Sequence, residues 1–193
     1  MKNFIEPRSF GTHDGSFHAD EVTACSLLLL FGLIDRDKIR RTRDPSVLER
    51  CDFVCDVGGV YDSTLRRFDH HQVGFQGSLS SAGMVLLYLK EQKWIEPALY
   101  DMFNRSLILG VDAHDNGVAK LEMGVASFSQ VVSNFLPIAY DATELPTQHT
   151  RCRTNGTDHQ RHALPPLHTA IHITNNKPTQ DCIHITIINT ALS

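Results

Sequence analysis

The sequence predicts an α/β fold, an open and mostly parallel sheet flanked by helices and followed by an irregular tail. Short β-like runs alternate with longer helical runs over the first 142 of the 193 residues, which is the pattern of a parallel sheet. Polar clusters follow several of the β-like runs, and ligands bind such sheets at the carboxyl ends of their strands. Residues 143–193 contain no aromatic residue, whereas residues 1–142 hold all ten Phe, all four Tyr and the only Trp.

Each element of the first part follows from periodicity or from a cap. Predicted strands, taken from short alternating or apolar runs, cover residues 8–12, 38–43, 52–56 and 64–71. Predicted helices cover about residues 20–33, 44–50, 81–94 and 97–109. The second helix has Asp44 as its cap and Pro45 at its first position, and Ser80 and Ser81 are expected to cap the third. The stretch VDAHDNG after the fourth helix is expected to be a loop.

The tail differs in composition from the rest of the chain. It holds 6 of the 11 His and 4 of the 8 Pro, and only residues 168–174 and 182–188 are periodic enough for edge strands. A histidine-rich metal tract is the functional alternative, but only His168 and His172 have helical ligand spacing. We therefore expect a domain over residues 1–142 and a tail over 143–193 that is poorly ordered or foreign to that domain.

Charge and cysteine content exclude some classes of protein. Residues 1–142 carry 14 basic and 19 acidic residues, so bulk affinity for nucleic acid through net positive charge is excluded. A local basic strip remains possible, and a solvated strand edge explains the same residues equally well: Lys38, Arg40, Arg41, Arg43, Arg66 and Arg67. Five Cys without a CxxC pair predict reduced thiols. The apolar run 27–34 is shorter than the roughly 20 residues of a membrane span, and no apolar leader is evident, so we expect a cytoplasmic chain without membrane contact.

Four clusters rich in His and Asp carry the chemistry. They are GTHDGSFHADE (11–21), VCDVGG (54–59), RFDHH (67–71) and VDAHDNG (111–117). Imidazole nitrogen together with carboxylate oxygen suits Mn²⁺, Zn²⁺ or Fe²⁺, and we place manganese first. Seven or more candidate ligands exceed the needs of one ion, so two ions are implied. Such a pair activates water and clamps a phosphoryl group, which predicts phosphoester hydrolysis.

Simpler explanations compete for each single residue. A lone His or Asp is more often a cap or a turn former than a ligand, and for His13 alone that explanation would win. The same explanation would require several coincidences to account for His13, His18 and Asp20 within eight residues together with the triplet 69–71. For Glu21 we favour solvation in the first turn of a helix over a role as a base. For Ser80 and Ser81 we favour capping over phosphate binding at a helix N-terminus.

These motifs also resemble a known family. The triplet 69–71 is that of DHH-type phosphoesterases, and GTHDGSFHADE, CDVGGVYD, RRFDHHQ, LSSAG and VDAHDNG, in this order, resemble the family named after the melanocyte proliferating gene. The resemblance covers about residues 10–142. It implies a metal-dependent hydrolase, and the eukaryotic member is described as a 3′–5′ RNA exonuclease.

Carried over by position, the resemblance implies a role for each motif residue. The implied metal ligands are His13, His18, Asp20, Asp56 as the bridging carboxylate, His70 and Asp112, with Asp115 as the alternative to Asp112. His71 would contact the scissile phosphate, and Asp69 would be a carboxylate that orients the neighbouring group. Both residues are therefore counted as catalytic. The candidates for substrate binding are Arg41, Arg43 and Ser81.

The chain departs from that family after about residue 144. Family members continue into a second domain, whereas the following segment resembles nothing we can place, which leads to the hypothesis of a frameshifted or truncated reading frame. Resequencing the locus tests it, because an unbroken frame ending at Ser193 would count against it. We expect a two-ion phosphodiester hydrolase acting on a nucleic acid or nucleotide. The alternatives are a small-molecule phosphohydrolase, such as a pyrophosphatase, and a metal-binding remnant without catalysis. The oligomeric state is left open.

Overall fold

The computed structural model describes residues 4–120, 122–134, 169–174 and 184–189. The chain separates into two compact units, Met1–Leu136 and Pro137–Ser193, which are described one at a time. The expected domain boundary at residue 142 falls outside the described residues and stays a prediction.

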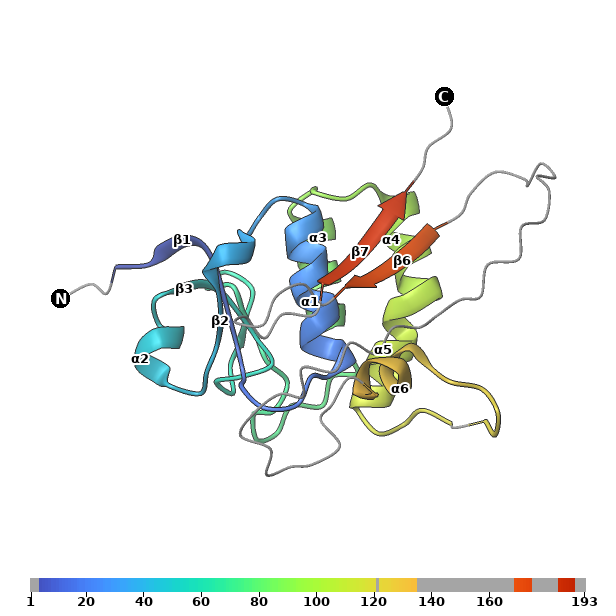
Figure 1. Ribbon diagram of the computed structural model, residues 1–193. Coiled ribbons are helices and arrows are strands. Elements are labelled where there is room, and N and C mark those ends of the chain that lie inside the picture. Colours follow the sequence, from blue (N-terminus) through green and yellow to red (C-terminus); the bar gives the residue numbers. More distant parts are fainter. Residues whose placement is uncertain (1–3, 121, 135–168, 175–183, 190–193) are drawn as a thin grey trace. The chain divides into compact units, whose positions relative to one another are not determined.

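A five-stranded sheet forms the centre of the first unit (Figure 1). Its spatial order is β2-β1-β3-β5-β4, and the strands span Glu6–Thr12 (β1), Ile39–Arg41 (β2), Cys51–Cys55 (β3), Tyr61–Asp62 (β4) and Arg67–Phe68 (β5). β1 pairs in parallel with β2 and β3, and β3 pairs in parallel with β5. Only the edge strand β4 is antiparallel to its neighbour. The predicted α/β fold with a mostly parallel sheet is confirmed.

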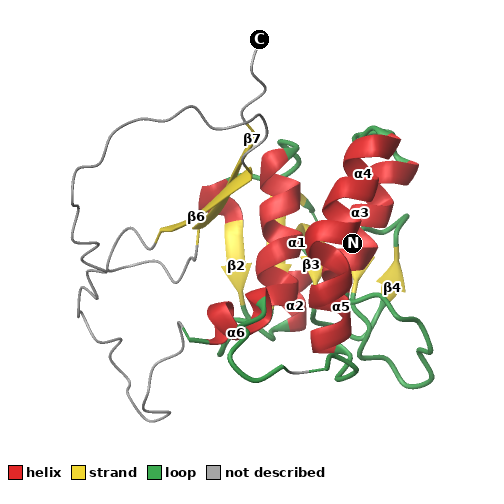
Figure 2. Ribbon diagram, turned by 90° about the vertical axis from the view of Figure 1, so that its right-hand side faces the viewer, coloured by secondary structure: helices red, strands yellow, loops and turns green. Residues whose placement is uncertain are grey.

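Helices cover both faces of this sheet unequally. Three helices lie over one face (Figure 2): α1 (Ala19–Leu30), α3 (Ser81–Glu91) and α5 (Leu109–Asp115). The short α2 (Pro45–Leu48) packs on β1 and β3 from the other side (Figure 1). It approaches so closely that a Cβ at Gly11 would lie 2.8 Å from Leu48 Cδ2. Gly11 therefore allows α2 to contact the sheet.

The remaining described helical segments of this unit connect or flank the layers. They are the 3₁₀ turn Arg36–Lys38, α4 (Pro97–Phe103), a π-helical turn over Asn104–Ile108 and α6 (Phe128–Ser133). The main core lies between the sheet and the helices, where the rings of Phe53 and Phe68 stack at 6.4 Å and Tyr88 of α3 meets both edge-on. As its apolar sequence predicts, α1 is buried on nearly every side.

Two element boundaries expected from the sequence are wrong, and the first places the candidate ligands Asp112 and Asp115 on a helix. The helix expected to end at Leu109 continues through the π turn into α5, so VDAHD is helical and not a loop. Ile108, Val111 and Asp112 all point inward on one face of this helix, at the spacing that drives helix burial. In the segment 64–71 only Arg67–Phe68 is a strand, because a turn that ends at Arg66, with φ 56°, precedes it.

The described part of the second unit is a two-stranded antiparallel sheet. β6 (Thr169–Thr174) pairs with β7 (His184–Asn189), with Thr169 opposite Asn189 and Thr174 opposite His184. The two periodic segments expected as strands are thus confirmed, whereas the other residues of the tail lie outside the described ranges. In the described part of the chain, no helix combines the length and the apolar character that crossing a bilayer requires.

Candidate metal centre

The predicted clusters meet at the carboxyl ends of β1, β3 and β5. His13 directly follows β1, Asp56 directly follows β3, and His70 and His71 come two and three residues after the end of β5. Because these three strands are parallel neighbours, their carboxyl ends lie at the same edge of the sheet. The N-terminus of α1, with His18 as its cap residue, reaches the same edge.

Asp56 lies at the middle of this cluster. Its Oδ2 is 3.3 Å from His13 Nε2 and 3.9 Å from His18 Nδ1. Its Oδ1 is 3.3 Å from His71 Nδ1 and 4.0 Å from His70 Nε2. Both oxygens are buried without a hydrogen-bond partner among the described residues, and the backbone has a left-handed φ of 56°. A buried carboxylate in a strained backbone, with imidazoles on both sides, belongs to a set of groups that could bind a metal ion.

The first group contains His13, His18, Glu21 and Asp56, whose ligand atoms lie within 4.8 Å of one another. His13 Nδ1 is 2.9 Å from the carbonyl oxygen of Asp14. A carbonyl only accepts, so Nδ1 carries the proton and Nε2 turns a lone pair toward Asp56. Burial is the largest single influence and lowers the pKa of His13, but Asp56, the Asp14 carbonyl and Glu21 together outweigh it, and the net shift is upward. A lone pair facing a carboxylate requires a proton or a metal ion between them.

Glu21 belongs to this group, which the sequence-based expectation missed. It is 1% exposed, and its Oε2 is 3.9 Å from His13 Nε2, so the expectation of a solvated first-turn carboxylate is wrong. Burial raises the pKa of Glu21 to about 7, although it accepts a hydrogen bond from the backbone N–H of His18 at 2.9 Å. The sequence did carry a signal for the position of Glu21. Glu at the third position after a helix cap bonds back to the cap residue, and this helix is apolar on nearly every side.

A second group contains Asp56, His70 and His71, and a third, which shares His70 with it, contains Asp20, His70 and Asp115. His70 Nε2 lies 2.8 Å from Asp115 Oδ2 and 4.0 Å from Asp20 Oδ2. The adjacent Asp115 carboxylate raises the pKa of His70 to about 9. Complete burial, followed by the charges of Asp56 and Asp115, raises the pKa of Asp20 to about 8. The carboxylates of Asp20, Asp56 and Asp115 repel one another, and a divalent cation would relieve that repulsion.

Asp69 orients His71 beside these groups. Its Oδ1 accepts hydrogen bonds from the backbone N–H of His71 at 3.0 Å and from His71 Nδ1 at 2.7 Å. Its other oxygen accepts the backbone N–H of Gly59 at 2.6 Å. Because a carboxylate accepts hydrogen bonds, His71 carries a proton at Nδ1. The His71 side chain is 62% exposed.

Asp112, the favoured fourth-motif ligand, makes different contacts from Asp115. Its Oδ1 accepts hydrogen bonds from the backbone N–H of Ser80 at 3.0 Å and from Ser80 Oγ at 2.7 Å. The same hydroxyl is 2.6 Å from Asp20 Oδ1. A Cβ added at Gly83 would lie 2.5 Å from Asp112 Oδ2, so Asp112 is packed against α3. It belongs to none of the ligand groups found in the described residues.

The serines do not cap α3 with their side chains as expected. Ser80 is the cap residue, yet its hydroxyl makes no capping bond. Carboxylates from other elements do so instead, because Asp20 accepts the backbone N–H groups of Ser81 and Ala82 at 2.9 and 2.5 Å, and Asp112 accepts that of Ser80. The reason is tertiary, since both acids are brought to the helix N-terminus, where negative charge is stabilised.

The candidate substrate-binding residues already have protein contacts. Arg41 lies over the ring of Phe17 at 4.0 Å, donates to the carbonyl oxygen of Gly15 at 3.0 Å and approaches Glu21 at 3.4 Å. Arg43 pairs with Asp14 at 3.2 Å. The Ser81 hydroxyl is buried without a partner among the described residues. Substrate binding by these residues stays a prediction.

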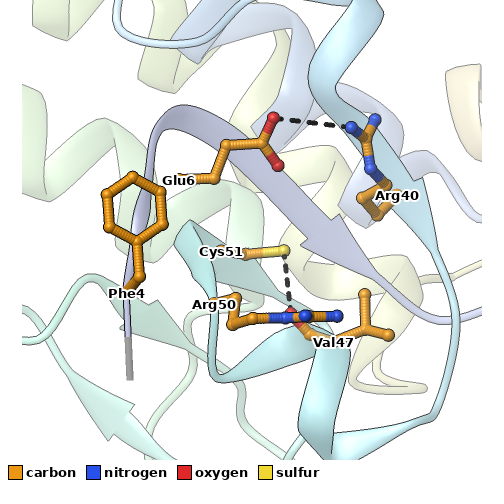
Figure 3. Close-up of a pocket in the computed structure, with 6 residues that line it drawn as sticks. All are labelled: Phe4, Glu6, Arg40, Val47, Arg50 and Cys51. Atoms are coloured by element: carbon orange, nitrogen blue, oxygen red, sulfur yellow. Dashed lines mark hydrogen bonds and ion pairs between the residues drawn. The ribbon is translucent and has the colours of Figure 1, made fainter. Parts of the chain in front are cut away.

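A pocket of about 390 Å³ lies away from this centre (Figure 3). It includes the N-terminal ends of β1 and β3, and its lining residues are Phe4, Glu6, Arg40, Val47, Arg50 and Cys51. Glu6 points toward Arg40 (Figure 3), and their charged groups are 3.5 Å apart. None of the candidate ligands lines this pocket.

Comparisons with known proteins agree with the residue pattern. Residues 9–150 match the family model MYG1_exonuc, described as "Uncharacterised protein family (UPF0160)". A Chlamydia pneumoniae protein named "MYG1 protein" is 56% identical over 131 residues, which are 68% of this chain and 45% of the relative. A Chlamydia trachomatis "MYG1 protein" is 54% identical over 132 residues, 68% of this chain and 46% of the relative. A Bos taurus "MYG1 exonuclease" is 38% identical over 146 residues, 63% of this chain and 38% of the relative.

The chain spans less than half the length of these curated relatives. The search of solved structures found no match. The family model nevertheless covers most of the chain, including every residue of the three ligand groups. By its sequence and by the residues gathered at the carboxyl edge of its sheet, this chain belongs to the MYG1 family.

Proposed function

We propose that this chain carries the metal centre of a nuclease-like phosphodiester hydrolase that uses two divalent ions, Mn²⁺ first. The observation that supports it most is Asp56, whose two buried oxygens face separate groups of imidazoles and have no hydrogen-bond partner among the described residues. A carboxylate is buried in this way only when a cation is to be bound or its charge is lost.

The ligands divide into two sets around Asp56. His13, His18 and Asp56 would hold one ion, with Glu21 adjacent. Asp20, Asp56, His70 and Asp115, which combine residues of the two groups that share His70, would hold the other. In this proposal Asp115 is a ligand, and Asp112 positions Asp20 through Ser80. The mixture of imidazole nitrogen and carboxylate oxygen suits Mn²⁺, Zn²⁺ or Fe²⁺ better than Mg²⁺ or Ca²⁺.

Bound divalent ions would polarise the phosphoryl oxygens and make a water molecule nucleophilic near neutral pH. The chain's own residues hold this acidic cluster together, and Arg41 is the one arginine or lysine that pairs with it among residues 4–120. Without metal, the negative charge of the cluster would repel a phosphate. His71, held at Nδ1 by Asp69 and exposed on its other side, is placed to contact a phosphoryl oxygen.

A nucleic acid is the favoured substrate. The relative from Bos taurus is named an exonuclease, and the exposed fractions of the His18 and His71 side chains, 54% and 62%, leave the centre open to a polymer. The 3′–5′ direction, an RNA substrate and the relation to DHH phosphoesterases belong to this proposal. Hydrolysis of a small phosphorylated molecule is the alternative, since the same ligands serve either substrate.

The test combines metal titration with hydrolysis assays on the purified chain. Calorimetry with Mn²⁺ should give two bound ions, and Mn²⁺ should restore the hydrolysis of short RNA after chelator treatment. His70→Asn should reduce hydrolysis by at least about tenfold, whereas His114→Asn, on α5 and outside the ligand groups, should leave it unchanged. Hydrolysis that persists in chelator, or is equal in the two variants, would refute the proposal. Cleavage of pyrophosphate alone would favour the alternative.

A further inference from the structure

An aromatic pair lies beside the second ligand group. The ring of Phe75, in the loop that follows the triplet 69–71, meets the ring of His70 at 6.5 Å and an interplanar angle of 86°. It also meets the ring of Tyr61, on the edge strand β4, at 6.2 Å and 83°. Phe75 therefore connects a candidate metal ligand to the edge of the sheet.

The loop is shaped around this ring. Gly74 has a φ of 87°, a conformation that favours glycine. A Cβ at Gly77 would lie 2.4 Å from the Phe75 ring, so glycine leaves the space that the ring fills. The position of Phe75 beside His70 is thus a built feature of the loop.

The pair remains partly in water although it has apolar neighbours. Tyr61 is 38% exposed and Phe75 is half-buried, while Val60 and Val73 nearby in the sequence are 47% and fully exposed. One exposed apolar side chain needs no explanation, but several beside a polar centre are typical of a binding surface. Two rings next to the candidate phosphate site match the size and chemistry of a nucleobase.

We propose that Phe75 and Tyr61 form a stacking platform for a nucleobase of the substrate, next to the phosphate held at the metal centre. This rests on the proposed hydrolase function and narrows its substrate to single-stranded nucleic acid. Stacking tolerates any base, because every base has an aromatic face. Charge alone does not provide such binding here, since the basic side chains near this edge, Arg41 and Arg43, already pair with acids.

The experiment measures binding, independently of catalysis. The probes are a phosphorothioate-linked thymidine hexamer, which resists cleavage, and an abasic hexamer of the same length, both fluorescently labelled and titrated with the chain in Mn²⁺. The wild-type chain should bind the thymidine hexamer about tenfold more tightly than the abasic one. Phe75→Leu, which keeps apolar bulk and removes the aromatic face, should abolish that preference, and Phe75→Tyr should keep it.

Trp94→Ala is the matched control, because Trp94 is a half-exposed aromatic residue just beyond the opposite end of α3 from the centre. It should leave the preference unchanged. A melting curve accompanies each variant, and Tyr61→Leu replaces Phe75→Leu if the latter unfolds. An unchanged preference in a folded variant would overturn the platform while leaving the hydrolase intact. Failure to bind Mn²⁺ or to hydrolyse RNA would refute the hydrolase, whereas a base preference lost in Phe75→Leu would still support the platform.

Discussion

The two ends of β3 carry an aspartate each, in opposite surroundings. Asp52, near the start of the strand, is 2.5 Å from Arg66 Nη1 and accepts the backbone N–H of Arg8 at 3.0 Å. Asp56, just after the strand, faces imidazoles, and its two oxygens have no hydrogen-bond partner among the described residues. One carboxylate has its counter-charge in an arginine of the protein, whereas the other would receive its counter-charge from the proposed metal ions.

Neighbouring acids show the same contrast in their pKa values. Hydrogen bonds from Arg8 and Lys38 lower the pKa of Asp35 to about 2, whereas burial and the charges of Asp56 and Asp115 raise that of Asp20 to about 8. The same functional group is stabilised as an anion in one place and destabilised in the other. Unfavourable charge concentrated at the carboxyl edge of a sheet is characteristic of a functional site.

The largest expected effect is on metal affinity when Asp56 is replaced. Asp56→Asn removes the shared carboxylate, so Mn²⁺ affinity measured by calorimetry should fall by at least about 100-fold. Asp52→Asn removes an acid from the same strand and should leave that affinity unchanged. Equal effects of the two substitutions would mean that the contrast between the ends of β3 has nothing to do with metal binding.

A second comparison separates the two acids of α5. Asp115→Asn should weaken Mn²⁺ binding by about 10-fold to 100-fold. Asp112→Asn keeps an oxygen that accepts the Ser80 hydrogen bonds, so it should change the affinity only a few-fold. Calorimetric titration of both variants decides between them, and a larger loss for Asp112→Asn would restore Asp112 as the ligand.

The stability of the metal-free chain should fall as pH rises. The pKa values of Asp20 and Glu21 are raised from 3.8 and 4.5 to about 8 and about 7, so the folded state binds protons more tightly than the unfolded state and loses stability between about pH 4 and pH 8. His70, with its pKa raised from 6.5 to about 9, acts in the same direction, since its stabilising charge is lost as pH rises through that value. Thermal melts in chelator should show this, and Mn²⁺ should raise the melting temperature most at alkaline pH. A metal-free chain that melts higher at alkaline pH would contradict the expected charge repulsion.

The smallest expected effects concern stability without metal. Asp56→Asn removes a buried charge that accepts no hydrogen bond, and asparagine tolerates positive φ, so the free energy of unfolding near pH 8 should rise by about 1 kcal/mol. Asp52→Asn weakens a partly exposed ion pair and should lower it by less than about 1 kcal/mol. Denaturant titrations in chelator measure both changes, and a decrease for Asp56→Asn would show that Asp56 is stabilised by the protein itself.

Much of the fold and of the site could be predicted from local pattern. Alternating strands and helices indicated the parallel sheet, and its parallel pairing placed His13, Asp56 and His70 at one edge. The expectation that VDAHDNG forms a loop was wrong, because the helix continues through the π turn. Asp112 and Asp115 therefore lie on a helix. Glu21 was misjudged because a residue in the first turn of a helix is usually exposed, and nothing local shows that other elements bury it.

The sequence by itself determined the kinds of ligand, the α/β class and the alternation that brings histidines and aspartates to the ends of strands. Only the tertiary structure decided which of those groups have partners. Ser80 joins Asp20 to Asp112, residues separated by more than ninety positions, and Phe75 reaches Tyr61 across the edge of the sheet. The reason is physical: residue type and periodicity are local properties, whereas burial, counter-charge and pKa depend on which distant segments pack together.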